Sequence, residues 1–349
     1  MKQLACETPL LHACCRLLLD VRSLGLSLLL LAGCGLSGPV PDRFPDADIV
    51  FQVTTLLLGE DEGRVGFVRA DGTEVSYLDL GKVAFRGGSH ALRAEMGPLV
   101  LPVWTSDGST LVFRGLHAPL YRGPLLAVRA GESAVVCPVE PGAERPSLAA
   151  DQEHMVIDLV GSGWRLGLYS LSNCLRSEGG QALTLYPISP ERNPGYGALS
   201  PRGDTLAYVG VDPGPPREQA VILRDVSTGL EKVVAHGSSP TWSANGGWLA
   251  YRGADGIHVV EADGSDDRRV VEYVSPEEGM SYENWPPLPS WSPDGKWIVY
   301  HKCTLPTDPK THCDLVQDYS IFKVNVETGK EVKILDGGLN PYWRWRTSK

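Results

Sequence analysis

The sequence contains no cluster of basic residues, and this absence limits the partners that the folded part can have. Its 32 Lys and Arg residues are outnumbered by 42 Asp and Glu residues, and the formal net charge is -10. Nucleic acids and anionic lipid surfaces attract concentrated positive charge. Neither is therefore expected as the ligand of the folded part.

Recognisable catalytic and metal-binding spacings are also missing. No Gly-x-Ser-x-Gly nucleophile elbow occurs. The histidines after Cys34 show no ligand spacing such as His-x-x-x-His. The sequence thus favours a binding protein over an enzyme, and it predicts no catalytic residue, cofactor or metal.

Long apolar runs are scarce, and the one that stands out lies near the N-terminus. Ser23 to Ala32 is too short to span a bilayer comfortably but suits the apolar core of an export signal. It runs into Leu31-Ala32-Gly33-Cys34, which resembles the lipobox of bacterial lipoprotein signal peptides at all four positions. The resemblance implies cleavage before Cys34 and attachment of lipid to its thiol.

This assignment divides the chain into three parts. Residues 1–33 are expected to be the signal peptide, residues 34–48 a lipidated cysteine with a flexible tether, and residues 49–349 the folded domain. The first 20 residues are long and partly acidic for a signal peptide. We therefore place the true translation start at Val21, a hypothesis that the mass of the unprocessed precursor would test.

The folded part is rich in turns and contains an internal repeat. The whole chain has 39 Gly and 27 Pro residues, and only 8% of it is aromatic. The repeat reads Pro-x-Trp-Ser-Pro-Asp-Gly followed by an apolar run, most clearly around Trp242 and Trp291. Six anchor positions recur at intervals of roughly 43 to 52 residues, the period of a four-stranded propeller blade: Trp104, Leu148, Leu199, Trp242, Trp291 and Trp343.

The last repeat is cut short by the end of the chain, and this predicts how the ring closes. A blade that begins at Trp343 lacks its remaining strands, which residues 49–57, 64–69 and 74–80 can supply. Sharing one blade between the two ends of the domain removes free sheet edges. The expected fold is an all-β, six-bladed propeller of four-stranded blades. The anchor tryptophans are expected to pack between blades.

These repeats resemble those of the TolB propeller family over roughly residues 49–349. The similarity is specific around Trp104, Trp242 and Trp291 and weak around Leu148. Two departures limit what the resemblance implies: no α/β domain precedes the propeller, and a lipobox is present. The same repeats occur in dipeptidyl peptidases, but this sequence ends at the propeller. The resemblance implies the fold and protein binding in the envelope, not a role in the Tol-Pal machine.

Four cysteines follow Cys34, and in an exported chain an even number indicates disulfides. Cys303 and Cys313 bracket a short insertion, and we expect them to pair. A zinc site formed by these cysteines with His301 and His312 is the competing interpretation, which the tight spacing disfavours. Cys137 and Cys174 fall in consecutive blades and are expected to cross-link them.

Other candidate site residues fall in a loop and along the predicted inner strands. Tyr282, Glu283 and Trp285 lie in a loop longer than the repeat needs, which is a candidate partner-binding surface. His154 and His301 lie near inner strands and are the candidates for channel-facing groups. The alternative is that both are ordinary hydrogen-bonded or solvated histidines.

Taken together, the sequence predicts a monomeric extracytoplasmic lipoprotein that binds an unidentified envelope protein or peptide. Lipid at Cys34 would hold it to the membrane. Gly35 in place of Asp after that cysteine favours the periplasmic face of the outer membrane in a Gram-negative organism. The alternative function is small-molecule or saccharide binding at the propeller axis, with metal-assisted lyase or hydrolase chemistry.

Overall fold

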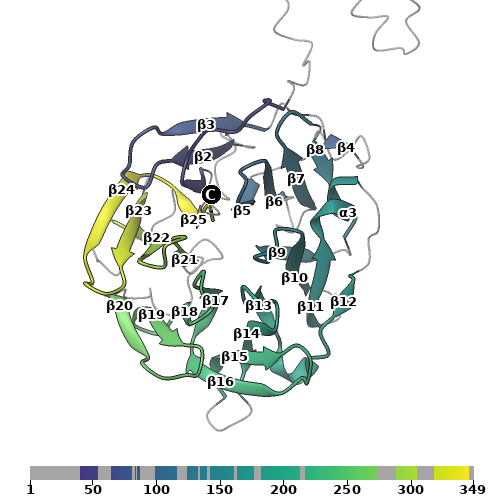
Figure 1. Ribbon diagram of the computed structural model, residues 1–349, viewed down its shortest axis with the longest axis vertical. Coiled ribbons are helices and arrows are strands. Elements are labelled where there is room, and N and C mark those ends of the chain that lie inside the picture. Colours follow the sequence, from purple (N-terminus) through teal and green to yellow (C-terminus); the bar gives the residue numbers. More distant parts are fainter. Residues whose placement is uncertain are drawn as a thin grey trace, which may run out of the picture. The chain divides into compact units, whose positions relative to one another are not determined.

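Six β-sheets stand around a central axis, and together they form the β-propeller that the repeats predict (Figure 1). The computed structural model describes residues 40–53, 64–80, 83, 85–86, 99–115, 124–132, 134–139, 142–160, 163–176, 182–212, 217–272, 288–304 and 318–345. Cys34 and the preceding signal sequence lie outside these ranges. None of the helices within them is long and apolar enough to cross a membrane.

Each blade has four antiparallel strands. In five blades the chain visits them from the axis outward, and blade one takes its innermost strand from the end of the chain. Blade one contains β25 (Leu339–Trp343), β1 (Ile49–Gln52), β2 (Arg64–Val68) and β3 (Ser76–Asp79). Blade two contains β5 (Leu99–Trp104), β6 (Thr110–Gly115), β7 (Leu125–Arg129) and β8 (Ala134–Val136). Blade three contains β9 (Ala143–Leu148), β10 (His154–Val160), β11 (Trp164–Ser170) and β12 (Thr184–Leu185).

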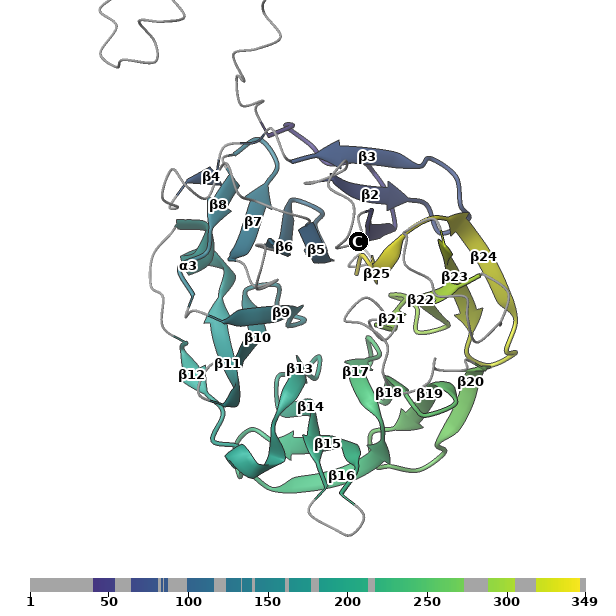
Figure 2. The same ribbon diagram turned by 180° about the vertical axis from the view of Figure 1, so that it is seen from behind.

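The remaining three blades repeat this order. Blade four contains β13 (Gly195–Leu199), β14 (Thr205–Val211), β15 (Gln219–Asp225) and β16 (Glu231–His236). Blade five contains β17 (Ser238–Trp242), β18 (Trp248–Arg252), β19 (Gly256–Glu261) and β20 (Arg268–Glu272). Blade six contains β21 (Ser290–Trp291), β22 (Trp297–Cys303), β23 (Tyr319–Asn325) and β24 (Glu331–Asp336). Viewed from behind, the same succession runs around the ring in the opposite sense (Figure 2).

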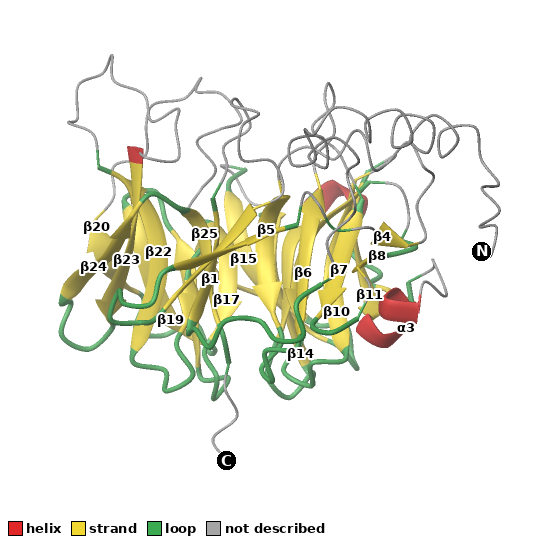
Figure 3. Ribbon diagram, turned by 90° about the horizontal axis from the view of Figure 1, so that it is seen from above, coloured by secondary structure: helices red, strands yellow, loops and turns green. Residues whose placement is uncertain are grey.

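Three short elements depart from the pure repeat. β4 (Phe85–Arg86) adds a fifth strand to blade two, parallel to β8. α3 (Leu171–Arg176) follows β11 at the rim, and a 3-10 helix (Pro190–Arg192) precedes β13. Figure 3 shows the ring from the side, with α3 at its outer edge and the strands running between the two faces.

The ring closes as the truncated last repeat predicts. In blade one, β25 from the end of the chain pairs antiparallel with β1 from the start of the domain. Ile49 lies opposite Trp343, and Val50 lies opposite Tyr342. Beyond the strand, the Arg344 backbone N–H donates to the carbonyl of Asp48 at 2.8 Å. Blade one therefore forms only when the two ends of the domain meet.

The anchor tryptophans join each blade to its neighbour, as expected. Trp104, Trp242, Trp291 and Trp343 are all buried. The Trp242 indole donates to the Ala198 carbonyl of blade four at 3.1 Å. The Trp291 indole makes the equivalent bond to Thr241 of blade five at 3.2 Å. The large anchor side chain of the repeat thus packs between blades. In blades five and six, its indole also forms one hydrogen bond to the innermost strand of the preceding blade.

The residues after the anchors build the turn into the second strand. In blade six the Ser292 hydroxyl donates to Asp294 and accepts from the Trp297 backbone N–H. Gly295 takes a φ of 67°, which a residue without Cβ adopts at little cost. In the degenerate blade three, Gln152 occupies the left-handed conformation instead, with a φ of 61°.

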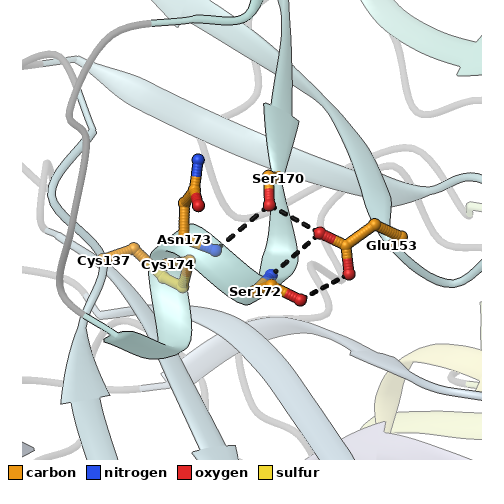
Figure 4. Close-up of a disulfide and its surroundings, with 6 residues drawn as sticks. All are labelled: Cys137, Glu153, Ser170, Ser172, Asn173 and Cys174. Carbon is orange, nitrogen blue, oxygen red and sulfur yellow. Dashed lines mark hydrogen bonds between the residues drawn. A yellow bond between two sulfur atoms is a disulfide. The ribbon is translucent and has the colours of Figure 1, made fainter.

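Blades two and three are joined by a disulfide between Cys137 and Cys174 (Figure 4). Cys137 directly follows β8, and Cys174 lies in α3. The Ser170 hydroxyl accepts a bond from the Asn173 backbone N–H at the start of α3, and Glu153 accepts from the hydroxyls of Ser170 and Ser172. By loop entropy, a cross-link over 37 residues stabilises a fold by about 4 kcal/mol.

The closure strand offers a sharp test at Gly66. This glycine lies opposite Phe51 of β1, and an added Cβ would come within 2.1 Å of the Phe51 ring, which is 1% exposed. We predict that Gly66→Ala lowers the free energy of unfolding in urea by about 2–3 kcal/mol through overpacking.

Gly163→Ala is the matched control, because a Cβ there meets no atom within 4 Å. It should change the free energy of unfolding by less than about 0.5 kcal/mol. Equal stability of the two variants would mean that the packing of β1 on β2 does not limit ring closure.

Candidate functional site

The innermost strands surround the axis, and their chain conformation repeats from blade to blade. Three residues before the anchor, four blades place a non-glycine residue at positive φ, and the strand pairing shifts its register there. These residues are Leu101, Tyr196, Ser239 and Asn340, with φ between 45° and 56°. Left-handed conformation costs such residues about 1–2 kcal/mol each. Strain repeated at one level of the ring marks that level as a candidate site.

The next position is proline in five of the six blades: Pro102, Pro146, Pro240, Pro289 and Pro341. We call these residues the proline collar. Proline suits a strand at the edge of a sheet because it has no N–H to leave unpaired. It also prevents another strand from pairing with that edge. The collar therefore adds rigid, apolar residues to the innermost strands and disfavours strand addition there.

A small cavity of about 60 Å³ lies between the innermost strands of blades six, one, two and three. Four collar prolines line it, together with Leu101, Val103, Leu288 and Tyr342. Its polar lining comes from Arg145, Ser290 and Asn340. We call it the axial cavity. Its walls are mainly apolar, and one lining side chain, Arg145, carries a charge.

Buried polar side chains encircle this level from the second strands. In each blade, one residue of the second strand pairs with the anchor, and the position of interest lies three residues later in that strand. In blade four this position holds the apolar Val209. The residues at this position in the other blades form what we call the polar belt: Gln52, Arg114, Asp158, Arg252 and His301. Four of these five are at most 4% exposed, and Arg252 is half-buried.

Three members of the belt reach the innermost strand of the following blade. Asp158 accepts from the backbone N–H groups of Tyr196 and Gly197 at 2.8 and 3.2 Å. His301 accepts from the backbone N–H of Asn340 at 3.1 Å. Each thus satisfies a donor that the strand irregularity turns away from its own sheet. Arg114 instead forms an ion pair with Glu144 at 3.4 Å.

The Arg145 guanidinium is positioned by a carboxylate and by an aromatic ring. Its guanidinium lies 3.3 Å from Asp158 Oδ2 and 4.0 Å from the centre of the Tyr196 ring. Burial raises the pKa of Asp158, whereas Arg145 and the two backbone donors oppose that rise. Burial also raises the pKa of Tyr196, so its hydroxyl remains protonated. Arg145 therefore lines the axial cavity with a guanidinium whose position is fixed by the Asp158 carboxylate and the Tyr196 ring.

The two candidate histidines lie elsewhere. His154 begins β10, and its Nδ1 is 2.6 Å from Asp151 in the preceding turn. His301 is 1% exposed and packs edge-on against Tyr319. Neither belongs to the lining of the axial cavity. Within the described ranges, no group of three or more His, Cys, Asp or Glu residues is placed to hold a metal ion.

The other predicted site residues divide between those inside and outside the described ranges. The predicted pairing of Cys137 with Cys174 is present. Cys303 ends β22 and is disulfide-bonded, while Cys313 lies outside the described residues, so their pairing remains a prediction. Cys34 and the loop residues Tyr282, Glu283 and Trp285 lie outside them as well.

Sequence reasoning missed Arg145, Asp158 and Tyr196. The collar prolines were visible within the repeat, two residues before five of the six anchors, and they were a usable signal for the axial lining. The belt had no such signal, because its members differ chemically and share only a position in the strand pairing.

No protein-family model matches the chain, and no curated protein matches it. Solved structures show similarity of fold at low sequence identity. TolB from Acinetobacter baumannii superposes with a TM-score of 0.61 at 13% identity, over 85% of this chain and 66% of that one. This chain thus spans slightly less than two thirds of that protein.

Two further structures are similar to this chain. A putative TolB from Agrobacterium tumefaciens gives a TM-score of 0.53 at 17% identity, over 69% of this chain and 83% of that one. Oligogalacturonate lyase from Vibrio parahaemolyticus gives 0.43 at 15% identity, over 83% of this chain and 74% of that one. At these identities the similarity to the two TolB structures is one of fold.

The buried pair at the axis generates a test of its role. We predict that Asp158→Asn lowers the free energy of unfolding by about 3–5 kcal/mol, because Arg145 loses its buried counter-charge. Urea unfolding measures this loss. The double variant Asp158→Asn with Arg145→Met should recover most of the lost stability, because the unpaired charge of Arg145 is then removed.

Arg202→Met is the control, because Arg202 pairs with Asp204 at the exposed surface. It should change stability by less than about 0.5 kcal/mol. A double variant no more stable than Asp158→Asn would show that the backbone hydrogen bonds, not the charge pair, hold the site.

Proposed function

We propose that this protein is a lipid-anchored extracytoplasmic propeller that binds a protein or peptide partner over its axis. The observation that carries the proposal is the axial cavity, walled by four prolines and entered by Arg145. Rigid apolar walls lose little conformational entropy when a partner side chain is buried against them.

The size of the cavity favours a partner's side chain over a free ligand. Pockets for small molecules usually enclose about 300–1,000 Å³. A cavity of about 60 Å³ accommodates one small apolar group, such as the end of a side chain. Saccharide binding at the axis, the alternative from the sequence, finds less support in this geometry.

The residue types at the cavity also suit a protein interface. Arg and Tyr are among the residues that contribute most to binding energy when they lie in desolvated positions. Arg145 is positioned by Asp158 and Tyr196. Its side chain is therefore held in place before a partner arrives.

The lipid anchor rests on Leu31-Ala32-Gly33-Cys34 and the Gly- and Pro-containing tether that follows. A thioether-linked diacylglycerol with an added acyl chain gives stable attachment to a membrane. Within the proposal, this attachment keeps the propeller at the membrane surface, with the outer membrane as the expected site in a Gram-negative cell.

Lipidation is tested by replacing its acceptor. We predict that cells fed an alkyne fatty acid label the wild-type protein, and that Cys34→Ala abolishes the label and moves the protein out of the membrane fraction. Cys303→Ala is the control and should retain both label and membrane fraction. Labelling that survives Cys34→Ala would reject the assignment.

Partner binding is tested by cross-linking whole cells and identifying captured proteins by mass spectrometry. Leu288 is half-buried and lines the axial cavity, so Leu288→Arg should block it and reduce capture by about tenfold. Leu230→Arg, at a 74% exposed leucine on the β15–β16 turn, should leave capture unchanged.

Circular dichroism confirms that each variant is folded before capture is compared. A single near-stoichiometric envelope protein, lost only with Leu288→Arg, is the expected result. If no protein is enriched, or if both variants capture the same protein as wild type, the axis is not the binding surface.

A further inference from the structure

A second and larger cavity, of about 390 Å³, lies between blades four and five. One wall is the apolar segment Val233–Ala235 of β16 with the adjacent His236. The other comes from β18, β19 and the residues before β20, and contributes Tyr251, Asp255, His258 and Asp267. We call it the interblade cleft. Its volume falls within the usual range for small-ligand sites.

The polar side chains of the cleft form one continuous hydrogen-bonded chain. The Tyr251 hydroxyl donates its proton to the carboxylate of Asp267, whose two oxygens lie 2.7 and 2.8 Å away. His258 places Nδ1 3.3 Å from Asp267 and Nε2 2.7 Å from Asp255. Arg269 donates to the second oxygen of Asp255 at 2.6 Å. Both carboxylates are thus oriented by the fold before any ligand binds.

The absence of a side chain at Gly253 helps to fix the position of the His258 ring. A Cβ at Gly253 would come within 2.7 Å of the His258 ring, so the ring fits only against glycine. On its other side the ring packs against Tyr251, with centroids 5.3 Å apart. The imidazole is therefore held between the two carboxylates by packing as well as by hydrogen bonds.

The charges that face the cleft do not balance. Asp255 and Asp267 are 57% and 41% exposed, and Glu218 lies 3.6 Å from His236. In the described part of the chain, Arg269 forms an ion pair with Asp255. Each carboxylate offers about four acceptor positions, and the donors named above occupy only part of them. Negative charge and open acceptor positions therefore remain, beside an apolar wall.

We infer that the interblade cleft binds a ligand that ends in an ammonium or guanidinium group carried on a short alkyl chain. The cationic end satisfies Asp255 and Asp267, and the methylenes lie against Val234 and Ala235. The hydrogen bond from His258 lowers the pKa of Asp255, which keeps its charge available. The ligand is a free aliphatic amine or the Lys or Arg side chain of a partner.

This inference is independent of the proposed axial function. The cleft and the axial cavity share no lining residue. An anionic ligand would lie beside the carboxylates of Asp255 and Asp267, and a purely apolar one would displace the water that solvates their remaining acceptor positions. The chemistry of the walls thus selects a cation with an apolar stem.

The experiment is isothermal titration of the purified protein with cadaverine and with agmatine at low ionic strength and neutral pH. 1-Pentanol and glutarate are the neutral and anionic probes of similar length. We expect saturable binding of one cation per chain and no binding of either control probe.

Variants locate the site. Asp255→Asn and Asp267→Asn should each weaken binding by about tenfold. Asp266→Asn removes the same charge from a neighbouring residue that pairs with Arg268, outside the cleft lining, and should leave binding unchanged. Ala254→Arg, at an exposed lining position, should block the cleft with its own guanidinium.

Other outcomes overturn the inference. These are the absence of saturable binding, equal binding of pentanol, or an equal loss in Asp266→Asn. Leu288→Arg should not alter amine binding, so failure at the axis and failure in the cleft are distinguishable. The blocked peptide acetyl-Gly-Lys-Gly-amide separates the two sources: binding as tight as that of cadaverine supports a partner's side chain, and binding of the free amine alone supports a small metabolite.

Discussion

The antiparallel pairing of β1 with β25 is the constraint on which the rest of the structure depends. Every other blade is built from one continuous stretch of chain, but blade one needs both ends of the domain. Until Ile49 meets Trp343, one blade lacks its innermost strand and its neighbours lack a packing surface. Arg344 then reaches the β5–β6 turn of blade two and donates to the carbonyls of Ser106 and Asp107. Closure therefore completes packing on both sides of blade one.

Closure also sets the geometry of the axis. The innermost strands carry strained residues and prolines at one level, which would be unfavourable in an isolated sheet. In the ring, Asp158 and His301 satisfy the donors that this conformation exposes in the next blade. The energy of blade packing thus offsets local strain, and the result is a rigid, apolar axial cavity beside the positioned Arg145.

The two proposed sites use the same architecture differently. The axial cavity arises where four blades meet, and each of them contributes two or three residues to its lining. The interblade cleft arises between one pair of neighbours and depends on groups found in blade five alone, Asp255, His258 and Asp267. The first suits contact with a partner over the face of the propeller, and the second suits recognition of a single charged group. A propeller can hold both because the two cavities share no lining residue.

Much of the fold could be predicted from the sequence alone. Each Pro-x-Trp-Ser turn and the apolar run after it is a local pattern, and the interval between anchors is set by the length of four strands. Trp343 without a blade after it was enough to predict the closure by residues 49–57. The sites could not be predicted in the same way. Arg145 meets Asp158 and Tyr196, and Asp255 meets Asp267 through His258, only because strand register and blade packing bring them together. A repeat in the sequence determines the units of the ring, whereas charges and cavities between units are decided by contacts that exist only after those units have packed.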